Sequence, residues 1–513
     1  MFDVITRLPF GFVLKLNSET SYYSENEFEV KINDTFYQKF NTNIFAIYGL
    51  KPNQTYKIEI SYNQQKYQRD EKTCKLSYFI DVCDYNAIGN GLVDDSAAIN
   101  AAIYNAPKGA VVYFKKGEYV VSGIFLKSNV DLYFEKGAII KQITNREHLA
   151  IVKGYQKDYA YESAMVNASW EGNPLDTYIS VINGYEVHNV RIYGEGIIDG
   201  SGKEGGWWHN PKVKQKAYRP KNWFLNKCQN IEIISLTSRN SASWNIHPYY
   251  CDHVSIYDVK LESDKNSPNT DGINPESCKD VRIRGCHFNV GDDCIALKSG
   301  KYFMSTFKPR ACENIWVDNC FMGDGHGGIA IGSEISCGVK NVLVENCFMQ
   351  GSDRGIRMKT RRGRGKLSVV ENIKIRNIVM QDITHVFAIN MYYNCDPDGH
   401  SEYVKAKNIT TCDAYTPTIK DIEICNVRAT NIKGCGIFIY GLSENKVNHI
   451  EIKDSIFTFN ITNNVEQPEM LDDFDTIDNL GIYINNIENM RIENTTFNGE
   501  YNQVIKEEIK WIK

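Results

Sequence analysis

Short runs in which apolar and polar residues alternate cover most of the chain, and their character changes near residue 80. Before that point the runs GFVLKL, NEFEVKI, NIFAIYGL, TYKIEISY and KLSYFI follow one another closely, with polar turns between them. Alternation with a period of two is typical of half-buried strands, and short strands at close intervals are typical of a β-sandwich. The pattern predicts a small sandwich domain over residues 1–79.

One turn of this predicted sandwich is more specific than the rest. In LKPNQTYKIEI, the residues Leu50, Pro52 and Tyr56 follow the L-x-P-x-x-x-Y spacing that leads into a late sandwich strand. In that turn the tyrosine hydroxyl hydrogen-bonds to backbone a few residues upstream. The segment resembles a fibronectin type III module, and a sandwich of another type is the alternative.

A helical pattern replaces the strands at residues 81–103. The run SAAINAAI is rich in alanine and helical in period, and Asp94, Asp95 and Ser96 before it are N-cap candidates. Stacks of repeats need a cap at their open end. We therefore expect one short helix to cover the end of whatever follows.

From residue 129 onward, a polar residue followed by an apolar–any–apolar triplet recurs along the chain. Where they are closest, these sites are spaced by about 23 to 27 residues, which is the spacing of a solenoid repeat. Each unit resembles a strand, so the pattern predicts an all-β domain over residues 80–513, a right-handed parallel β-helix. The polar positions are Asn129, Asn189, Asn230, His253, Asp280, Asn314, Asn341, Asn372, Asp421, His449 and Asn489.

The cysteines fit the same phase. Cys286, Cys320 and Cys347 each follow a polar position at the same offset, where other repeats carry Ser455 or Val427. Small or apolar residues at one offset predict a column inside the coil. These cysteines are therefore expected to fill the core rather than to bind metal or form disulfides.

The most distinctive chemistry lies in the stretch NTDGINPESCKDVRIRGCHFNVGDDCIALKS. Asp271 precedes the pair Asp292–Asp293 by about one coil, and successive coils of a parallel β-helix are about 4.8 Å apart. His326 follows about one coil plus an insertion later. Carboxylates held this close raise one another's pKa, and acid/base catalysis needs one protonated and one ionised group. For one motif alone, Asn/Asp/Gly turn chemistry is the simpler explanation; several motifs in phase indicate a catalytic site.

The next coil adds bases. RGIRMKT carries Arg357 and Lys359, with Asp324 and Arg354 expected to flank them, and the following residues extend a basic run. Arginine and lysine suit a substrate that bears carboxylates. The rest of the run is expected on the rim of the site: Arg361, Arg362, Arg364 and Lys366.

Together the segments NTDG, GDDCIALKSG, GHGGIAIGSE and RGIRMKT resemble, in order, the signature segments of the polygalacturonases, glycoside hydrolase family 28. The resemblance covers roughly residues 80–500 and implies inverting hydrolysis of α-1,4-linked galacturonic acid. The family usually has R-I-K in the last segment; here Met358 takes the middle place.

The resemblance also implies roles for individual residues. Asp292 would protonate the glycosidic oxygen, Asp271 and Asp293 would hold and activate water, and His326 would tune or orient the acid. Inverting glycosidases place such carboxyls about 6.5–9.5 Å apart, which suits acids displaced by one coil. The residues assigned to substrate binding are Arg357, Lys359, Asn269, Lys298 and Arg354.

Composition narrows the partners. A formal net charge of −5 over 513 residues argues against a general nucleic-acid binder, and the chain lacks an apolar stretch long enough to span a membrane. The 15 cysteines include no CxxC pair, so neither a zinc site nor any other metal or cofactor is expected. Without a recognisable signal peptide, the expected compartment is the cytoplasm. The expected partner is polygalacturonate or its oligomers.

Two other functions stay open. A calcium-dependent pectate lyase could use paired aspartates as calcium ligands and an arginine as base. A non-catalytic carbohydrate-binding β-helix would also suit a tandem sandwich module. Turnover on oligogalacturonate, ultraviolet absorbance of an unsaturated product and sensitivity to a chelator separate these readings.

Long insertions bear on where the substrate is cut. Residues 153–184 form an aromatic-rich segment between repeat strands, and residues 395–417 and 461–480 are further insertions. Loops of this size beside a groove can close one end. The resemblance to longer, exo-acting family members points the same way, so removal of mono- or digalacturonate from a chain end is expected. The aromatic residues expected to build the wall are Tyr155, Tyr159, Tyr161, Trp170 and Tyr178.

Overall fold

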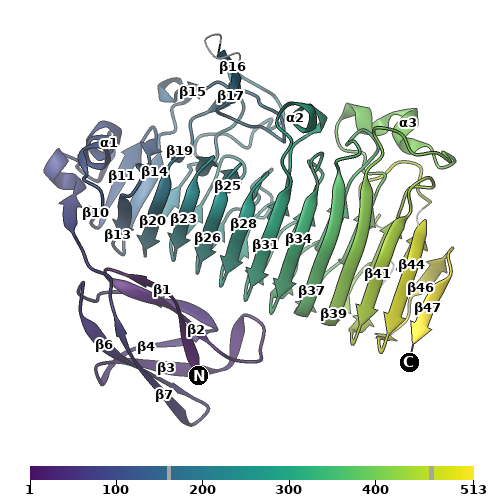
Figure 1. The fold of residues 1–513 in the computed structure, drawn as a ribbon, viewed down its shortest axis with the longest axis horizontal. Helices are drawn as coiled ribbons and strands as arrows, with labels where there is room; N and C mark the ends of the chain where they lie inside the picture. Colours follow the sequence, from purple (N-terminus) through teal and green to yellow (C-terminus); the bar gives the residue numbers. More distant parts are fainter. Residues whose placement is uncertain (159–162, 462–466, 476, 513) are drawn as a thin grey trace.

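The computed structural model describes residues 1–158, 163–461, 467–475 and 477–512. Its N-terminal part is a sandwich of two antiparallel sheets, one in the order β1-β2-β5 and the other in the order β4-β3-β6-β7 (Figure 1). The strands are β1 (Phe2–Leu8), β2 (Gly11–Leu16), β3 (Tyr23–Ile32), β4 (Thr35–Thr42), β5 (Ile44–Ile47), β6 (Thr55–Tyr62) and β7 (Gln65–Lys72).

The predicted tyrosine turn is present in this sandwich. The hydroxyl of Tyr56 accepts a hydrogen bond from the backbone N–H of Lys51 at 2.8 Å, and it donates to Gln54. Leu50 and Tyr56 both join the sandwich core. The bond ties the loop before β6 to the strand, as expected for a tyrosine corner.

The remainder is a parallel β-helix, as predicted. The chain enters it at β8 (Tyr78–Asp81), which pairs in parallel with β10 (Ala110–Phe114). A 25-stranded sheet forms most of the coil wall, and shorter parallel sheets complete it on the side that carries the predicted acids. The division into domains 1–79 and 80–513 stays a prediction.

The strands of the 25-stranded sheet are β8 (Tyr78–Asp81), β9 (Asn90–Asp94), β10 (Ala110–Phe114), β11 (Gly117–Val121), β13 (Asp131–Phe134), β14 (Ala138–Gln142), β20 (His188–Gly194), β21 (Ile197–Asp199), β23 (Gln229–Ile234), β24 (Thr237–Arg239), β26 (Asp252–Tyr257), β27 (Lys260–Glu262), β28 (Lys279–Arg284), β29 (His287–Asn289), β31 (Cys312–Asp318), β32 (Phe321–Met322), β34 (Val339–Glu345), β35 (Phe348–Gln350), β37 (Val369–Gln381), β39 (Thr418–Ile432), β41 (Val447–Lys453), β42 (Ile456–Phe459), β44 (Ile487–Glu493), β45 (Thr496–Asn498) and β47 (Ile509–Ile512). A four-stranded sheet contains β12 (Ile124–Phe125), β19 (Ile182–Tyr185), β22 (Trp223–Asn226) and β25 (Ile246–Tyr249). A seven-stranded sheet continues on the same side with β30 (Asp293–Leu297), β33 (Gly327–Ile331), β36 (Arg354–Lys359), β38 (His385–Asn390), β40 (Ile437–Tyr440), β43 (Leu480–Asn485) and β46 (Asn502–Ile505).

All eleven recurring polar residues share one backbone conformation. Each has a positive φ, for example 56° at Asn189, 54° at Asn230 and 59° at Asn314. Asn and Asp tolerate this left-handed region better than other residues with a Cβ. Several also hydrogen-bond along the stack, as Asn341 does to Asn314 at 3.1 Å. The polar position therefore marks a bend that each coil repeats.

The predicted cysteine column lies in the core. Cys286, Cys320 and Cys347 are fully buried together with Val427 and Ser455, and the cysteines are free thiols. At the N-terminal end of the coil, α1 (Ser96–Asn105) buries Ile99, Ala102 and Ile103 in the same core, so the predicted cap is also present.

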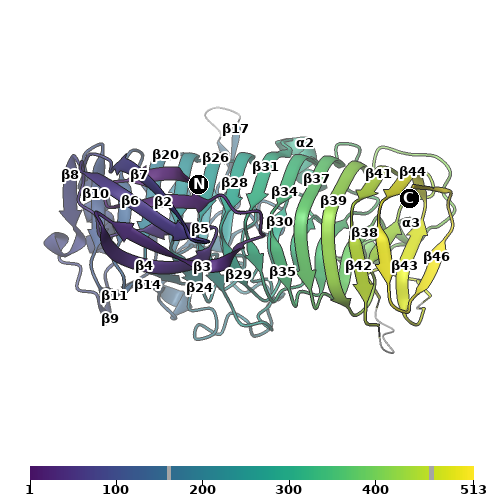
Figure 2. The same cartoon turned by 90° about the horizontal axis from the view of Figure 1, so that it is seen from below.

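The sandwich packs on the outside of the 25-stranded sheet (Figures 1 and 2). The buried carboxylate of Asp318 on β31 pairs with Lys15 of the sandwich at 3.0 Å and with Arg284 of the β-helix at 2.8 Å. An apolar cluster joins the two parts and consists of Leu8, Val13, Ile44, Tyr48, Val111, Tyr193, Ile234 and Tyr257.

Insertions gather on the opposite edge of the β-helix, at the top of Figure 1. They contain the paired strands β15 (Ile151–Val152) and β18 (Thr177–Tyr178), the hairpin β16 (Tyr155–Asp158) and β17 (Ser163–Val166), α2 (Tyr302–Phe307) and α3 (Glu402–Lys405). Short 3-10 helices are η1 (Val82–Tyr85), which contacts α1 at the N-terminal end of the coil, η2 (Arg146–His148) and η3 (Pro397–His400). No helix among these described residues has the length and hydrophobicity that a membrane span needs.

Candidate active site

The coils that carry the predicted acids stack in register. An isolated parallel bridge joins Ile273 to Ile295, and Asp271 and Asp293 each lie two residues before it. Asp293 in turn pairs with Gly327 at the start of β33. The two acids thus occupy one column on neighbouring coils, at the spacing of paired parallel strands.

All nine residues assigned from the sequence line one cavity of about 600 Å³. They are Asp271, Asp292, Asp293, His326, Arg357, Lys359, Asn269, Lys298 and Arg354. Cavities of this size bind small molecules in many proteins. The geometry brings the residues together, while their individual roles stay predictions.

Asp271 is the most enclosed acid of the site. Its carboxylate is 3% exposed and accepts a hydrogen bond from Asn274 at 2.7 Å. Burial, followed by the negative charge of Asp292, raises the pKa of Asp271 to about 8, although Lys298 opposes the shift. Of its two ionisation states, the surroundings of Asp271 thus favour the protonated one.

Asp293 is held by two bases from two coils away. Its carboxylate accepts from Lys359 Nζ at 2.8 Å and from Arg357 Nη1 at 3.5 Å. The coil between them has Gly327 at the crossing point, where a Cβ would lie 2.7 Å from Asp293 Oδ1 and 2.9 Å from Arg357 Cδ. Glycine at this position leaves room for the bases to reach the acid.

Asp292 faces a histidine instead. His326 Nδ1 lies 3.5 Å from Asp292 Oδ1. Burial alone would raise the pKa of Asp292, but the interaction with His326, together with Lys359 and Lys298, lowers it below its usual range. The same interaction raises the pKa of His326. The two groups titrate as a pair that holds one proton between them.

The remaining bases of the cavity also have acidic partners. Lys298 Nζ lies 2.9 Å from Glu334 and 3.9 Å from Asp271, over the ring of Trp244 at 4.5 Å. Burial would lower the pKa of Lys298, but the charge of Glu334, and then of Asp271, raises it. The ammonium thus stays charged beneath the acids.

Arg357 has a partner that the sequence did not reveal. Its Nε and Nη2 donate to the two carboxylate oxygens of Glu469 at 2.8 and 2.7 Å. Glu469 belongs to the insertion at residues 461–480, and both side chains are nearly inaccessible to solvent. Nothing in the short motifs signals this pairing, because the two residues are 112 positions apart.

Asn269 is connected to another residue that sequence reasoning missed. Its side-chain oxygen accepts from Arg219 Nη2 at 2.6 Å, and Arg219 also donates to the carbonyl oxygens of Ala242 and Pro268. Burial lowers the pKa of Arg219 to about 10. Arg219 thus fixes Pro268 and Asn269, which directly precede Thr270 and Asp271 of the NTDG segment.

Loops from several insertions enclose the cavity. On one side Glu171 and Lys212 line it and form an ion pair at 2.7 Å. On another side the lining residues are Tyr393, which follows the end of β38, Asp396 of the 395–417 insertion and Met470 of the 461–480 insertion. Other lining residues that the motifs did not predict are Trp244, Ser333, Glu334, Asp353, Cys395 and Pro397.

The predicted aromatic wall differs from the structure. Trp170 is buried in a stack with Tyr218 at 5.0 Å, and Tyr178 packs against Trp207. Among the described residues of 153–184, the side chain that lines the cavity is the charged Glu171 rather than an aromatic ring. Tyr159 and Tyr161 lie outside the described residues. Aromatic rings here gain more by packing among themselves than by facing solvent.

Three arginines of the basic run after the site were also placed wrongly, whereas Lys366 is exposed as expected. Arg361, Arg362 and Arg364 are not on an exposed rim but are 1%, 1% and 3% exposed. Arg361 pairs with Asp398 at 2.8 Å, and Arg362 pairs with Glu444 while donating to backbone carbonyls of residues 403–406. These arginines fasten the 395–417 insertion.

Asp324 does not flank the site as expected. It forms an ion pair with Lys265 at 2.8 Å and does not line the cavity. Among the described residues, no cluster of three or more His, Cys, Asp or Glu side chains is placed to hold a metal ion.

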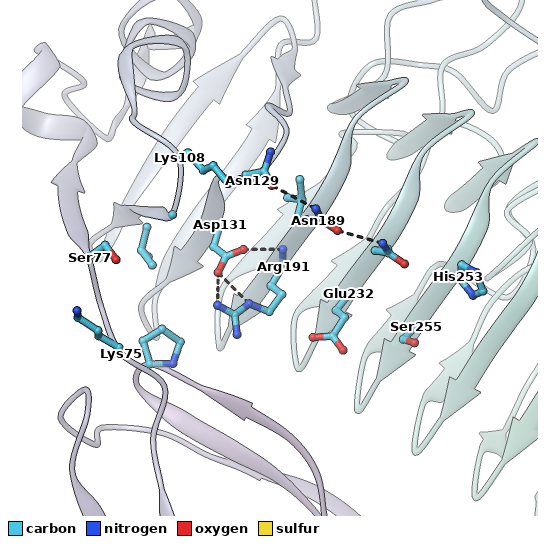
Figure 3. Close-up of a pocket in the computed structure, with 15 residues that line it drawn as sticks. Lys75, Ser77, Lys108, Asn129, Asp131, Asn189, Arg191, Glu232, His253 and Ser255 are labelled. Atoms are coloured by element: carbon cyan, nitrogen blue, oxygen red, sulfur yellow. Dashed lines mark hydrogen bonds and ion pairs between the residues drawn. The ribbon is translucent and has the colours of Figure 1, made fainter.

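A second hollow, of about 550 Å³, lies where the sandwich meets the β-helix (Figure 3). Asn129, Asn189 and Asn230 run along it as a hydrogen-bonded row, and Oδ2 of Asp131 accepts hydrogen bonds from Arg191 Nη2 and Nε at 2.6 and 2.8 Å. It contains one further carboxylate, Glu232, and no grouped acids. The catalytic candidates are all in the other cavity.

Comparison with known proteins shows the family. The family model for glycosyl hydrolases family 28 matches residues 163–454, more than half of the chain and including every predicted site residue. The chain belongs to this family. A second model, for the rhamnogalacturonase A/epimerase, pectate lyase-like group, matches residues 79–175.

Named relatives of this family 28 chain include a "Probable polygalacturonase" of Vitis vinifera, 31% identical over 333 residues, which are 62% of this chain and 64% of the relative. An "Exo-poly-alpha-D-galacturonosidase" of Dickeya chrysanthemi is 25% identical over 401 residues, which are 70% of this chain and 64% of that protein. This chain thus spans less than two thirds of the length of these two relatives.

Among solved structures, a family 28 exopolygalacturonase from Yersinia enterocolitica aligns with 100% of this chain and 98% of its own at a TM-score of 0.73 and 18% identity. An exopolygalacturonase from Thermotoga maritima aligns with 83% of this chain and 94% of its own at a TM-score of 0.66 and 24% identity. At these identities the likeness establishes the fold, including the right-handed coil.

Proposed function

We propose that this family 28 glycoside hydrolase cleaves the α-1,4 bonds of polygalacturonate or its oligomers with inversion, and that it releases mono- or digalacturonate from a chain end. The observation that carries the proposal is the grouping of Asp271, Asp292 and Asp293 in one cavity with bases around them. The names of the relatives, which include polygalacturonases and exo-acting enzymes, support the substrate and the mode.

In the proposed reaction, Asp292 protonates the glycosidic oxygen. The proton for this step is held by the Asp292–His326 pair. Before substrate binds, His326 keeps this proton. When substrate displaces water from the site, the proton can pass to the carboxylate of Asp292. His326 is a positioning and proton-holding partner of the acid.

The water-activating role falls on the other two acids. Asp293, which contacts Lys359 and Arg357, is the base that removes the proton of the attacking water. Asp271, in its favoured protonated state, donates a hydrogen bond that orients the same water. Attack from the face opposite the leaving oxygen inverts the anomeric centre.

Two lysines are the proposed ligands of the uronate carboxylate. Lys298 and Lys359 lie in one column with Gly332 between them. An ammonium group has three donors, so each lysine can keep its acidic partner and still bind a substrate carboxylate. Asn269 and Arg354, which also line the cavity, complete the proposed substrate contacts.

The enclosed shape supports action at chain ends. An unobstructed β-helix face would admit the middle of a polymer, whereas here Glu171 with Lys212, and Met470 with Asp396, stand around the acids. A cavity of about 600 Å³ has room for few sugar units. A polymer end can enter such a cavity more easily than an internal segment.

Two further assignments belong to the same proposal. The sheets β1-β2-β5 and β4-β3-β6-β7, with the Tyr56 corner, support a fibronectin type III-like module. The free thiols support a reducing compartment, the cytoplasm.

The deciding experiment is chromatography of early products from polygalacturonate, with proton NMR of the new reducing end and viscosity followed in parallel. We expect mono- or digalacturonate alone, the β-anomer first, and a slow fall in viscosity relative to reducing ends. A ladder of oligomers with a rapid viscosity drop would overturn the exo mode. Unsaturated products that a chelator abolishes would identify a lyase, and binding without turnover would identify a non-catalytic protein.

A further inference from the structure

Glu469 occupies the place on Arg357 that a substrate carboxylate would take. The guanidinium presents its Nε and Nη2 edge to Glu469 at 2.8 and 2.7 Å, which is the bidentate geometry of arginine with a carboxylate. Its third nitrogen, Nη1, points to Asp293 at 3.5 Å. The fork that the family resemblance assigns to uronate binding is therefore already filled by the protein.

The segment that carries Glu469 is fastened on both sides of that residue. Arg354 Nε donates to the carbonyl oxygen of Pro468 at 2.9 Å, and Asn390 donates to that of Met470 at 3.0 Å. Asn394 donates to Asp472 at 2.7 Å. Since several bonds would have to break together, Glu469 is fixed behind Arg357, next to the cavity residue Met470, and is not an arm that the substrate displaces.

The charges around Glu469 cancel. Arg354 and Arg357 are balanced by Glu469 and Asp353, with Arg354 lying 3.5 Å from Glu469 and 3.9 Å from Asp353. A uronate placed here would meet no net positive charge and would face the negative charge of Glu469. Desolvating its carboxylate would then cost more than the site returns.

An apolar side chain lies next to this cluster. The side chain of Met470 is 49% exposed and lines the cavity, and the hydroxyl of Tyr393 donates to its sulfur at 3.4 Å. Thioether and ring surfaces suit a methyl or methylene group better than a charged one. This observation is independent of the ion pairs and points to the same kind of ligand.

We infer that the subsite at Arg357 accepts a sugar whose C6 carries no free charge, either a methyl-esterified uronate or a neutral hexose, and that Glu469 sets this preference. The inference rests on the proposed function. His326, the proposed proton-holding partner of Asp292, lies just before β33, and β36 with Arg357 follows on the next coil, whereas Lys298 directly follows β30 on the coil before. The sugar at Arg357 is therefore the leaving sugar, and the uronate held by Lys298 and Lys359 is the one released.

Three disaccharides test the preference directly. Each has a galacturonate residue α-1,4-linked to a reducing sugar, which is galacturonate, its methyl ester or galactose. For the parent protein we expect kcat/KM on the ester and on the galactose compound to equal or exceed that on the free acid. Comparing kcat/KM on the methyl ester with kcat/KM on the galactose compound shows whether the subsite prefers an esterified uronate or a neutral hexose.

Glu469→Gln keeps the shape of the side chain and removes its charge. We expect kcat/KM on the free acid, relative to the ester, to rise at least about tenfold in this variant, because Arg357 regains a net charge. Glu469→Asp keeps the charge and should stay close to the parent ratio, which makes the pair informative if the glutamine variant is less stable.

Glu444→Gln is the matched control. Glu444 forms an equally buried bidentate pair with Arg362, at 2.6 and 2.7 Å, outside the cavity. The control should lower the melting temperature to a similar extent and leave the substrate ratio unchanged. It separates loss of a buried ion pair from loss of the charge that selects the sugar.

A parent protein that cleaves the free acid at least tenfold better than both uncharged compounds would overturn the inference. So would a Glu469→Gln variant that folds and keeps the parent ratio. Failure to cleave any of the three, together with failure on polygalacturonate, would reject the proposed function instead.

Discussion

At the scale of single residues, the three acids differ in what surrounds them. Asp293 contacts two bases, Asp292 faces one histidine, and Asp271 lies buried beside Asn274. These surroundings raise the pKa of Asp271, lower that of Asp292 and raise that of His326. Asp293 differs from both other acids in its direct contacts with two cations. Three chemically identical side chains thus obtain different roles from their neighbours.

The first prediction concerns Asp292. Asp292→Asn removes the group that donates the proton, so kcat should fall by at least about two orders of magnitude. The asparagine fits the same space, and the melting temperature should change little. Asp324→Asn is the control, because Asp324 bonds Lys265 outside the cavity; similar turnover in the two variants would remove Asp292 from the acid role.

The second prediction is a pH dependence. The interaction with Asp292 raises the pKa of His326, so the pair keeps its proton at low pH and loses it only as pH rises through a value above that of an ordinary histidine. Activity that needs this proton should therefore fall on the alkaline side. In His326→Asn the proton is held by Asp292 alone, and the alkaline limb of kcat/KM should move to lower pH by about one unit or more. An unchanged limb with reduced kcat would mean that His326 acts only sterically.

At the scale of elements, the coil of β33 matters because it carries small side chains between β30 and β36. Gly327 pairs with Asp293, and Ala330 pairs with Arg357 one coil on. Small residues on this coil let side chains of β36 lie back over it and reach the acid on β30. The site therefore depends on three successive strands, of which the middle one supplies space.

The third prediction tests that space. In Gly327→Ala the new Cβ would lie 2.7 Å from Asp293 Oδ1, so the carboxylate and Arg357 must shift. A shift of about 1 Å in a reacting group can cost about a hundredfold in rate. We expect kcat to fall by about ten- to a hundredfold while the melting temperature drops only slightly. Parent-like kcat would show that Asp293 tolerates displacement.

Strand periodicity explains how much of this could be predicted from the sequence. The polar bend, the cysteine column and the acids repeat with the coil, so their positions on a β-helix follow from their spacing. Glu469 and Arg219 belong to loops whose paths no period determines. The buried Arg361–Arg364 run was placed on the surface because charge pattern alone does not show which carboxylates the insertions supply.

At the scale of the whole molecule, the sandwich and the catalytic cavity lie on different sheets of the β-helix. The sandwich covers strands of the 25-stranded sheet, whereas the acids belong to the side that carries β30, β33 and β36. Its bonds to the β-helix, such as Lys15 to Asp318 and Asn43 to Asn319 at 3.1 Å, involve no cavity residue. The sandwich therefore has a structural connection to the enzyme core and no direct one to the chemistry.

The last prediction measures that separation in the intact chain. Asp318→Ala removes the fully buried carboxylate that Lys15 and Arg284 share, and it leaves two cations facing each other at the interface. Charged hydrogen bonds of this kind contribute about 1–3 kcal/mol, so the free energy of unfolding should fall by about that amount. Since no cavity residue contacts Asp318, kcat/KM on oligogalacturonate should stay within about twofold of the parent below the melting transition. Calorimetry and steady-state kinetics on one preparation check the loss of stability and the retained activity. A tenfold loss of kcat/KM in the folded variant would show that the interface between the sandwich and the β-helix is coupled to the catalytic acids.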